Sequence, residues 1–176
     1  MSTSILHGRV WRQGGPRRRL LYCSEPAATS GRYHREGERG AWYASSMERA
    51  AWAEHIRHMS LGGVDPLLIR RRVGRAMLVG LRVLDLTDAR ACAALGIERG
   101  DLTGDDYARC QELADQARAA GFDGILAPSA AFAGEFTVVV FVHAMHKVTE
   151  EHSRVQHAPK TMRKFVRRIL RKEPRP

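Results

Sequence analysis

Residues 31–54 read Gly-Arg-Tyr-His-Arg-Glu-Gly-Glu-Arg-Gly-Ala-Trp-Tyr-Ala-Ser-Ser-Met-Glu-Arg-Ala-Ala-Trp-Ala-Glu. The first ten residues continue a segment, 24–40, whose glycine, serine and charge predict a loop. Residues 41–45 have the aromatic character of a strand. Ser46 is then a reasonable N-cap for a helix over residues 47–59. This loop, strand and helix carry Arg32, Tyr43 and Glu54 at equal intervals of eleven residues.

Glu54 has the strongest case for a functional role. Ala50, Ala51 and Glu54 lie three or four residues apart, so they share one face of the predicted helix. Two small residues beside a carboxylate are an unusual core pattern, and they indicate that Glu54 faces a cleft. The alternative is a solvated helix face, which suits Glu48 better.

The other candidate residues each have a structural alternative. Arg32 follows a glycine in an open loop, where a surface arginine is common. Tyr43 and its neighbour Trp42 point to opposite faces of a strand, so one packs inward and the other faces the cleft. Ser129 follows Pro128 in a turn, where hydroxyls often cap backbone groups. Arg12 is the fifth candidate, and residues 17–19, all arginines, are close enough in sequence to replace it.

The rest of the chain predicts an α+β fold. Residues 136–144 form an almost unbroken apolar run, which is typical of a buried central strand. Residues 67–86, after a break at Gly62-Gly63, predict two strands, or one long bent strand and a second strand. Further strands are expected at 8–12, 20–23, 41–45 and 124–127, and helices at 47–59, 105–120 and 160–172, with a short helix between Thr87 or Asp88 and Gly96. Strands early and late with helices between them favour mixed α+β architecture.

Composition describes an ordinary globular chain with an uneven charge. The 176 residues suit one domain, and 44% of them are hydrophobic. Residues 159–176 contain eight Lys or Arg and one Glu, and so supply +7 of the net charge of +10. The remaining body is near +3, so direct nucleic-acid binding is not expected. The predicted final helix has an apolar stripe, which either packs on its own domain or binds a partner.

No membrane segment, leader or cofactor motif is expected. No apolar run approaches the ~20 residues needed to span a bilayer, and the N-terminus lacks the pattern of a signal peptide. The three cysteines form no CxxC, which indicates a reduced, cytoplasmic protein. The pairs His55/His58 and His143/His146 lack further ligands at metal-binding spacing, and residues 143 and 146 would point to opposite faces of a strand. No metal site is therefore predicted.

The layout resembles the RES-domain toxins of bacterial RES–Xre toxin–antitoxin pairs, which are named for an arginine, a glutamate and a serine. The resemblance rests on Trp11-Arg12, on the stretch 31–54 and on Gly-Phe-Asp-Gly-Ile-Leu-Ala-Pro-Ser at 121–129. Residues 84–88 and the pair Asp106-Tyr107 add to it. The match runs from about residue 8 to 142. We therefore expect a RES-like domain over residues 1–150 and a basic C-terminal helical extension over 151–176.

This resemblance implies an ADP-ribosyltransferase-like fold, with mixed or antiparallel sheets and flanking helices, and an enzyme that consumes NAD. Catalysis would fall to Glu54, Arg32 and Tyr43. Binding of the dinucleotide would fall to Arg12 and Arg32 at the pyrophosphate, Tyr43 at the nicotinamide ring and Ser129 at the nicotinamide-ribose end.

The acceptor stays open at this point: water, inorganic phosphate or a protein side chain. The implied partner is a helix-turn-helix antitoxin that blocks the NAD cleft, with the toxin as a homo-oligomer within the complex. The alternatives are an ADP-ribosyltransferase that modifies a cellular protein and a non-catalytic protein that binds through its basic C-terminal helix.

Overall fold

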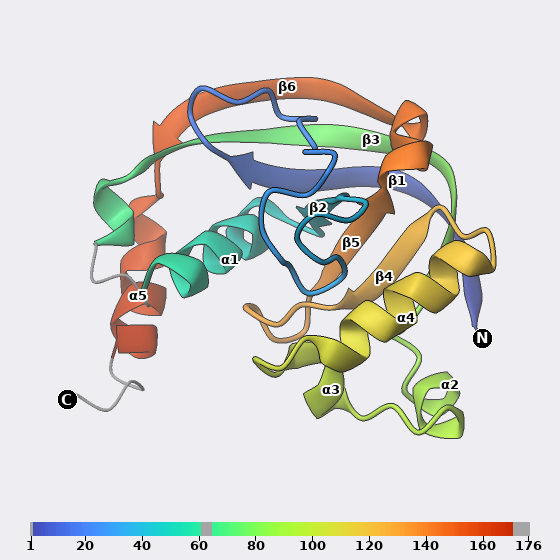
Figure 1. Ribbon diagram of the computed structural model, residues 1–176. Coiled ribbons are helices and arrows are strands. Elements are labelled where there is room, and N and C mark those ends of the chain that lie inside the picture. Colours follow the sequence, from blue (N-terminus) through green and yellow to red (C-terminus); the bar gives the residue numbers. More distant parts are fainter. Residues whose placement is uncertain (1, 61–64, 171–176) are drawn as a thin grey trace.

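Six strands form one sheet whose pairings close on themselves (Figure 1). The computed structural model describes residues 2–60 and 65–170. The strands are β1 (Thr3–Gly14), β2 (Ala41–Ser45), β3 (Arg70–Asp85), β4 (Gly124–Pro128), β5 (Phe136–Phe141) and β6 (Val148–His157). Their order is β1-β2-β5-β4-β3-β6, and β1 also pairs with β3, which closes a ring of five strands. Only β3 and β4 run parallel among the described strands.

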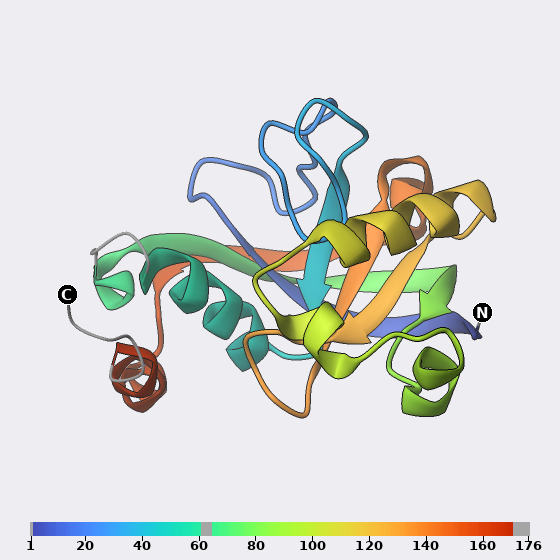
Figure 2. The same ribbon diagram turned by 60° about the horizontal axis from the view of Figure 1, so that its bottom comes forward.

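Helices flank this sheet in two groups (Figures 1 and 2). Helix α1 (Glu48–Ser60) follows β2 directly, and α5 (Arg163–Leu170) lies beside it. The second group contains α2 (Ala89–Ala94), α3 (Arg99–Thr103) and α4 (Ala108–Ala119). Three short 3-10 helices complete the described elements: η1 (Pro66–Leu68), η2 (Val142–Lys147) and η3 (Lys160–Met162). The expected α+β class is confirmed. No helix among the described residues is long and apolar enough to cross a membrane.

The core explains the positions of β5 and α5. Val138, Val139, Val140 and Phe141 are all buried, as expected for a central strand, because β2 and β4 pair with β5 on its two edges. Helix α5 packs on its own domain, since Met162 and Val166 share a hydrophobic cluster with Trp52 and Ile56. Over the residues whose side chains are described, the apolar stripe of the C-terminal segment thus packs on α1 and on Phe132, whose ring stacks on Phe165.

Several local predictions match the structure. Strand β2 has the expected bounds, and α1 begins one residue later than predicted. Asp88 caps α2, its side chain accepting from two backbone amides. Gly121 ends α4 with a φ of 72°, a left-handed conformation that glycine adopts without strain. The Gly62-Gly63 break lies outside the described residues.

Four local predictions are wrong. Residues 20–23 are not a strand, because two of their carbonyls accept hydrogen bonds from side chains instead of from a neighbouring strand. Trp42 Nε1 donates to Leu20 O at 3.1 Å, and Arg12 Nη2 donates to Tyr22 O at 2.9 Å. Helix α3 was not expected. Strand β5 ends at Phe141, and the histidine pair at 143 and 146 lies in η2 rather than on a strand. Residues 151–157, expected within the helical extension, continue β6, because β3 offers them a free edge for backbone pairing. The boundary expected after residue 150 therefore falls inside a strand.

Strand β3 is a single element of 16 residues. Its pairing with β6 continues through Gly74. A Cβ at this position would collide with the carbonyl of His152 on β6. The glycine permits close approach of two paired backbones.

Candidate functional site

A cavity of about 470 Å³ lies between α1, β2 and the loop that precedes β2. This volume falls within the roughly 300–1,000 Å³ of pockets that hold cofactor-sized ligands. Four of the five expected site residues line it: Arg12 from β1, Arg32 from the loop, Tyr43 from β2 and Glu54 from α1. The fifth, Ser129, is buried and does not line the cavity, but it contacts Glu54.

Glu54 is the only carboxylate among the described residues that line the cavity. Ala50 and Ala51 on the same helix face are buried, and Ala51 also lines the cavity, so small side chains leave room in front of the carboxylate. The hydroxyl of Ser129 donates to Glu54 Oε1 at 3.3 Å and accepts from the backbone N–H of Phe132 at 3.1 Å. Ser129 thus holds one carboxylate oxygen from the protein side.

Arg32 brings a guanidinium into the cavity without a complete set of partners. Its Cζ lies 4.6 Å from the centroid of the Tyr107 ring, a cation–π geometry. Its Nη1 is buried and has no hydrogen-bond partner among the described residues. A buried, unpaired guanidinium nitrogen is costly. An anionic ligand in the cavity would supply the missing acceptor.

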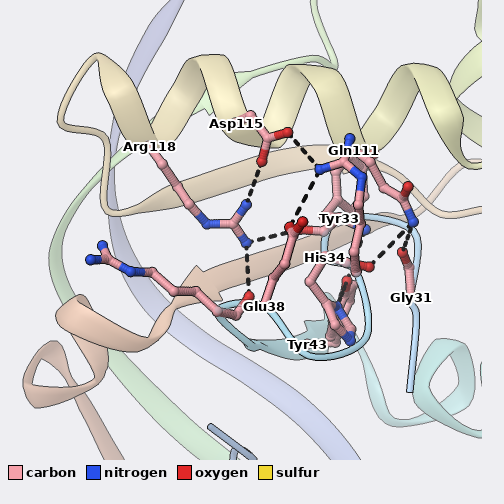
Figure 3. Close-up of polar contacts among 10 residues, drawn as sticks. Gly31, Tyr33, His34, Glu38, Tyr43, Gln111, Asp115 and Arg118 are labelled. Carbon is pink, nitrogen blue, oxygen red and sulfur yellow. Dashed lines mark hydrogen bonds and ion pairs between the residues drawn. The ribbon is translucent and has the colours of Figure 1, made fainter. Parts of the chain in front are cut away.

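Tyr43 lines the cavity, and its hydroxyl forms hydrogen bonds with the loop that precedes β2. The hydroxyl accepts from the backbone N–H of Tyr33 at 3.0 Å and lies 2.8 Å from Nδ1 of His34. Burial raises the pKa of Tyr43, so the phenol stays neutral at physiological pH. Figure 3 shows Tyr33, His34 and Tyr43 gathered below helix α4. The hydrogen bonds of the Tyr43 hydroxyl therefore hold the loop that carries Arg32.

Arg12, rather than the arginines at 17–19, lines the cavity. Its Nη2 donates to Tyr22 O at 2.9 Å, and its Cζ lies 5.1 Å from the centroid of a Trp42 ring. Burial lowers the pKa of Arg12 to about 10, so the group is still charged at neutral pH. Residues 17–19 are exposed.

Several lining residues were not given a role from the sequence, among them Arg57, Tyr107 and His34. Arg57 donates to Ala130 O and to Asp105 Oδ1, both at 2.5 Å, and so joins α1 to two other segments. Its position three residues after Glu54 was a usable signal, because such residues share a helix face. Tyr107 was named only as part of the Asp106-Tyr107 pair, without a role in the site. His34 had no signal beyond its place in the loop.

The charged groups of the lining are therefore mainly cationic, around one carboxylate. Three arginines, at 12, 32 and 57, contribute to it. Burial lowers the pKa of His34, which also lines the cavity, so this imidazole stays neutral near pH 7. Within residues 2–60 and 65–170, no three His, Cys, Asp or Glu side chains gather as ligands for a metal ion. The arrangement suits an elongated anion that brings an electron-poor centre to Glu54.

Comparison with known proteins adds three findings. The sequence model described as RES domain matches residues 6–161. A probable NAD(+) phosphorylase of Mycobacterium tuberculosis is 50% identical over 154 residues, which cover 88% of this chain and 74% of that relative. A chain in the crystal structure of the M. tuberculosis MbcT–MbcA toxin–antitoxin complex superposes with a TM-score of 0.78. It is 22% identical, and the match covers 97% of this chain and 92% of that chain.

Proposed function

Because this chain belongs to the RES domain family, we propose that it depletes NAD by cleaving the bond between nicotinamide and ribose. The observation that carries this proposal is the single carboxylate, Glu54, within a cavity lined by three arginines. The name of the 50% identical relative, a probable NAD(+) phosphorylase, supports the same substrate.

One carboxylate is sufficient for this reaction. Most glycosidases need two, because one must protonate the leaving group. Nicotinamide in NAD is a cationic pyridinium, so it takes the bonding electron pair and departs as a neutral molecule. Positive charge develops on the ribose as the bond lengthens, and the Glu54 carboxylate stabilises that charge.

The remaining lining residues bind and orient the substrate. Arg32 and Arg12 hold the pyrophosphate, since guanidinium groups pair well with phosphate oxygens. The unpartnered Nη1 of Arg32 supports its part in this role. Tyr43 stacks on the nicotinamide ring. Ser129 acts through its hydrogen bond to Glu54.

Inorganic phosphate is the acceptor that we favour, because of the relative's name. A phosphate oxygen forms the new bond to the ribose carbon as the bond to nicotinamide breaks. The products are nicotinamide and ADP-ribose phosphorylated at that carbon. With water as acceptor, the product would be free ADP-ribose.

A protein partner completes the proposal. The fold is shared with a chain from a toxin–antitoxin complex, which supports a role as the toxin of such a pair. We propose that a helix-turn-helix antitoxin covers the cavity and keeps NAD out, with the toxin as a homo-oligomer in the complex. We place the reaction in the cytoplasm, where NAD is available.

The test is product analysis of NAD incubated with the purified protein, with and without phosphate. We expect phosphate-dependent loss of NAD, and Glu54→Gln should lower kcat by about 10³-fold. Glu48→Gln is the matched control: Glu48 lies on the same helix, outside the cavity, and accepts from Gln156 Nε2 at 2.9 Å. Equal activity in both variants would remove Glu54 from the mechanism. No loss of NAD by the wild type would reject the proposed function.

A further inference from the structure

One face of α4 and the residue that precedes this helix contact the loop that carries Arg32. One stripe along this helix contains four residues at intervals of four, four and three: Tyr107, Gln111, Asp115 and Arg118. The apolar residues of the helix form a neighbouring stripe and are buried in the core. Figure 3 shows Gln111, Asp115 and Arg118 reaching toward the loop from the helix.

Gln111 makes the contacts that bracket Arg32. Its Nε2 donates to Gly31 O at 3.0 Å and to His34 O at 3.3 Å. The carbonyls of residues 31 and 34 lie on either side of Arg32 in the chain. The two residues also pair with each other, Gly31 N–H donating to His34 O at 2.9 Å. One side-chain amide therefore ties both ends of a short turn to the helix.

The turn formed by residues 31–34 is tightly packed. Its position therefore depends on the hydrogen bonds of the Gln111 side-chain amide. A Cβ at residue 31 would collide with the His34 ring, so a larger residue there would displace that ring. Tyr33 is held separately: its carbonyl accepts from Arg118 Nη2 at 3.0 Å, and its N–H donates to Tyr43 Oη at 3.0 Å. Among the described contacts that side chains of α4 make with this loop, only those of Gln111 reach both sides of Arg32.

The head group of Arg32 is aligned by the same part of the chain. Its guanidinium lies over the ring of Tyr107, which immediately precedes α4 and lies four residues before Gln111. We propose that Gln111 is a positioning residue, which sets the place of the Arg32 guanidinium in the cavity and thereby the affinity for the anionic part of the substrate. This inference rests on the proposed function, in which Arg32 holds the pyrophosphate.

The first test compares Gln111→Leu with Gln116→Leu. Gln116 lies on the exposed side of α4, and its side chain makes no hydrogen bond within the described residues. Because Arg32 binds the substrate before and during the reaction, we expect Gln111→Leu to raise KM for NAD about 10-fold with kcat within about 2-fold. Gln116→Leu should change neither. A purely structural defect would instead lower kcat through loss of folded enzyme, and that result would overturn the proposal.

The second test is a double-mutant cycle with Arg32→Ala. If Gln111 acts through Arg32, adding Gln111→Leu to Arg32→Ala should change kcat/KM by less than about 2-fold, because coupled residues are not additive. If the two losses multiply, Gln111 acts on something else and the inference fails.

A third measurement separates this inference from the proposed function. If the wild type does not consume NAD, the proposed function fails but the geometry can still be tested. Backbone hydrogen exchange of the peptide covering residues 31–39 should then be faster in Gln111→Leu than in Gln116→Leu. Unchanged exchange would show that the amide does not hold the turn and would overturn the positioning role.

Discussion

Ser129 donates its hydroxyl hydrogen to Oε1 of Glu54 across 3.3 Å. The two residues are 75 positions apart, and their contact joins the exit of β4 to helix α1. Since the same hydroxyl accepts from Phe132 N–H, its proton is directed at the carboxylate. Ser129 is therefore placed to orient the group that we propose stabilises the ribose cation, without itself lining the cavity.

Replacing Ser129 by alanine should slow the reaction without preventing folding. The lost hydrogen bond leaves Glu54 free to rotate, and we expect kcat for NAD to fall about 10-fold, equivalent to about 1.4 kcal/mol. Ser46→Ala is a suitable control, because Ser46 Oγ also donates to a glutamate, Glu135 Oε2 at 2.6 Å, outside the cavity. Steady-state kinetics on both variants decide the matter. An equal fall in both would point to general destabilisation.

Tyr43→Phe separates the ring of Tyr43 from its hydroxyl. The ring can still stack on nicotinamide, but Tyr33 N–H loses its acceptor. We expect the free energy of unfolding to fall by about 1–2 kcal/mol and KM for NAD to rise several-fold as the loop loosens. Urea denaturation and kinetics measure the two effects. Unchanged KM would mean that the ring alone matters for binding.

Arg12 should contribute more to binding than Arg18, although both lie near the same end of β1. Arg12 lines the cavity, whereas Arg18 is exposed and its Cζ lies 4.9 Å from the centroid of the Tyr22 ring. We expect Arg12→Ala to raise KM for NAD by roughly 10- to 100-fold, the loss of one charge-assisted contact. Arg18→Ala should stay within about 2-fold of the wild type. The reverse order of KM values would assign the phosphate contact to residues 17–19.

Local patterns predicted much of the site. The sequence 41–54 contains a strand, a helix start and a small-residue face within one short segment, so nearest-neighbour rules were enough to direct Glu54 toward a cavity. Arg32 was assigned a role by the resemblance to RES-domain toxins, because an arginine in an open loop is by itself more often a surface residue. What these patterns could not provide was the long-range hydrogen bonds that join the segments around the cavity: Arg57 bonds to Ala130, and Gln111 bonds to Gly31, across 73 and 80 residues.

Strand β6 shows why other elements escaped prediction. Most of its residues from 149 to 157 are exposed, so no alternating apolar pattern marks them. Its backbone pairs with β3 from Arg70 to Leu78, and that long-range pairing makes it a strand. Tertiary context determines such edge strands, whereas the buried strand β5 was evident from composition.

His55 should make the stability of the protein depend on acidity. It is 3% exposed, and burial, reinforced by the charges of Arg71 and His58, lowers its pKa from 6.5 to about 4. Between pH 6.5 and about pH 4, His55 binds a proton in the unfolded chain but not in the folded protein. The free energy of unfolding should therefore be fully retained above about pH 6.5 and fall as the pH drops toward 4, by about 2 kcal/mol between pH 7 and pH 5.

Urea midpoints at the two pH values measure the fall. His55→Gln should remove most of this difference, whereas His58→Gln, at an exposed histidine on the same helix, should retain most of it, because burial is the largest cause of the lowered pKa of His55. An equal pH dependence in both variants would assign the titration to other groups.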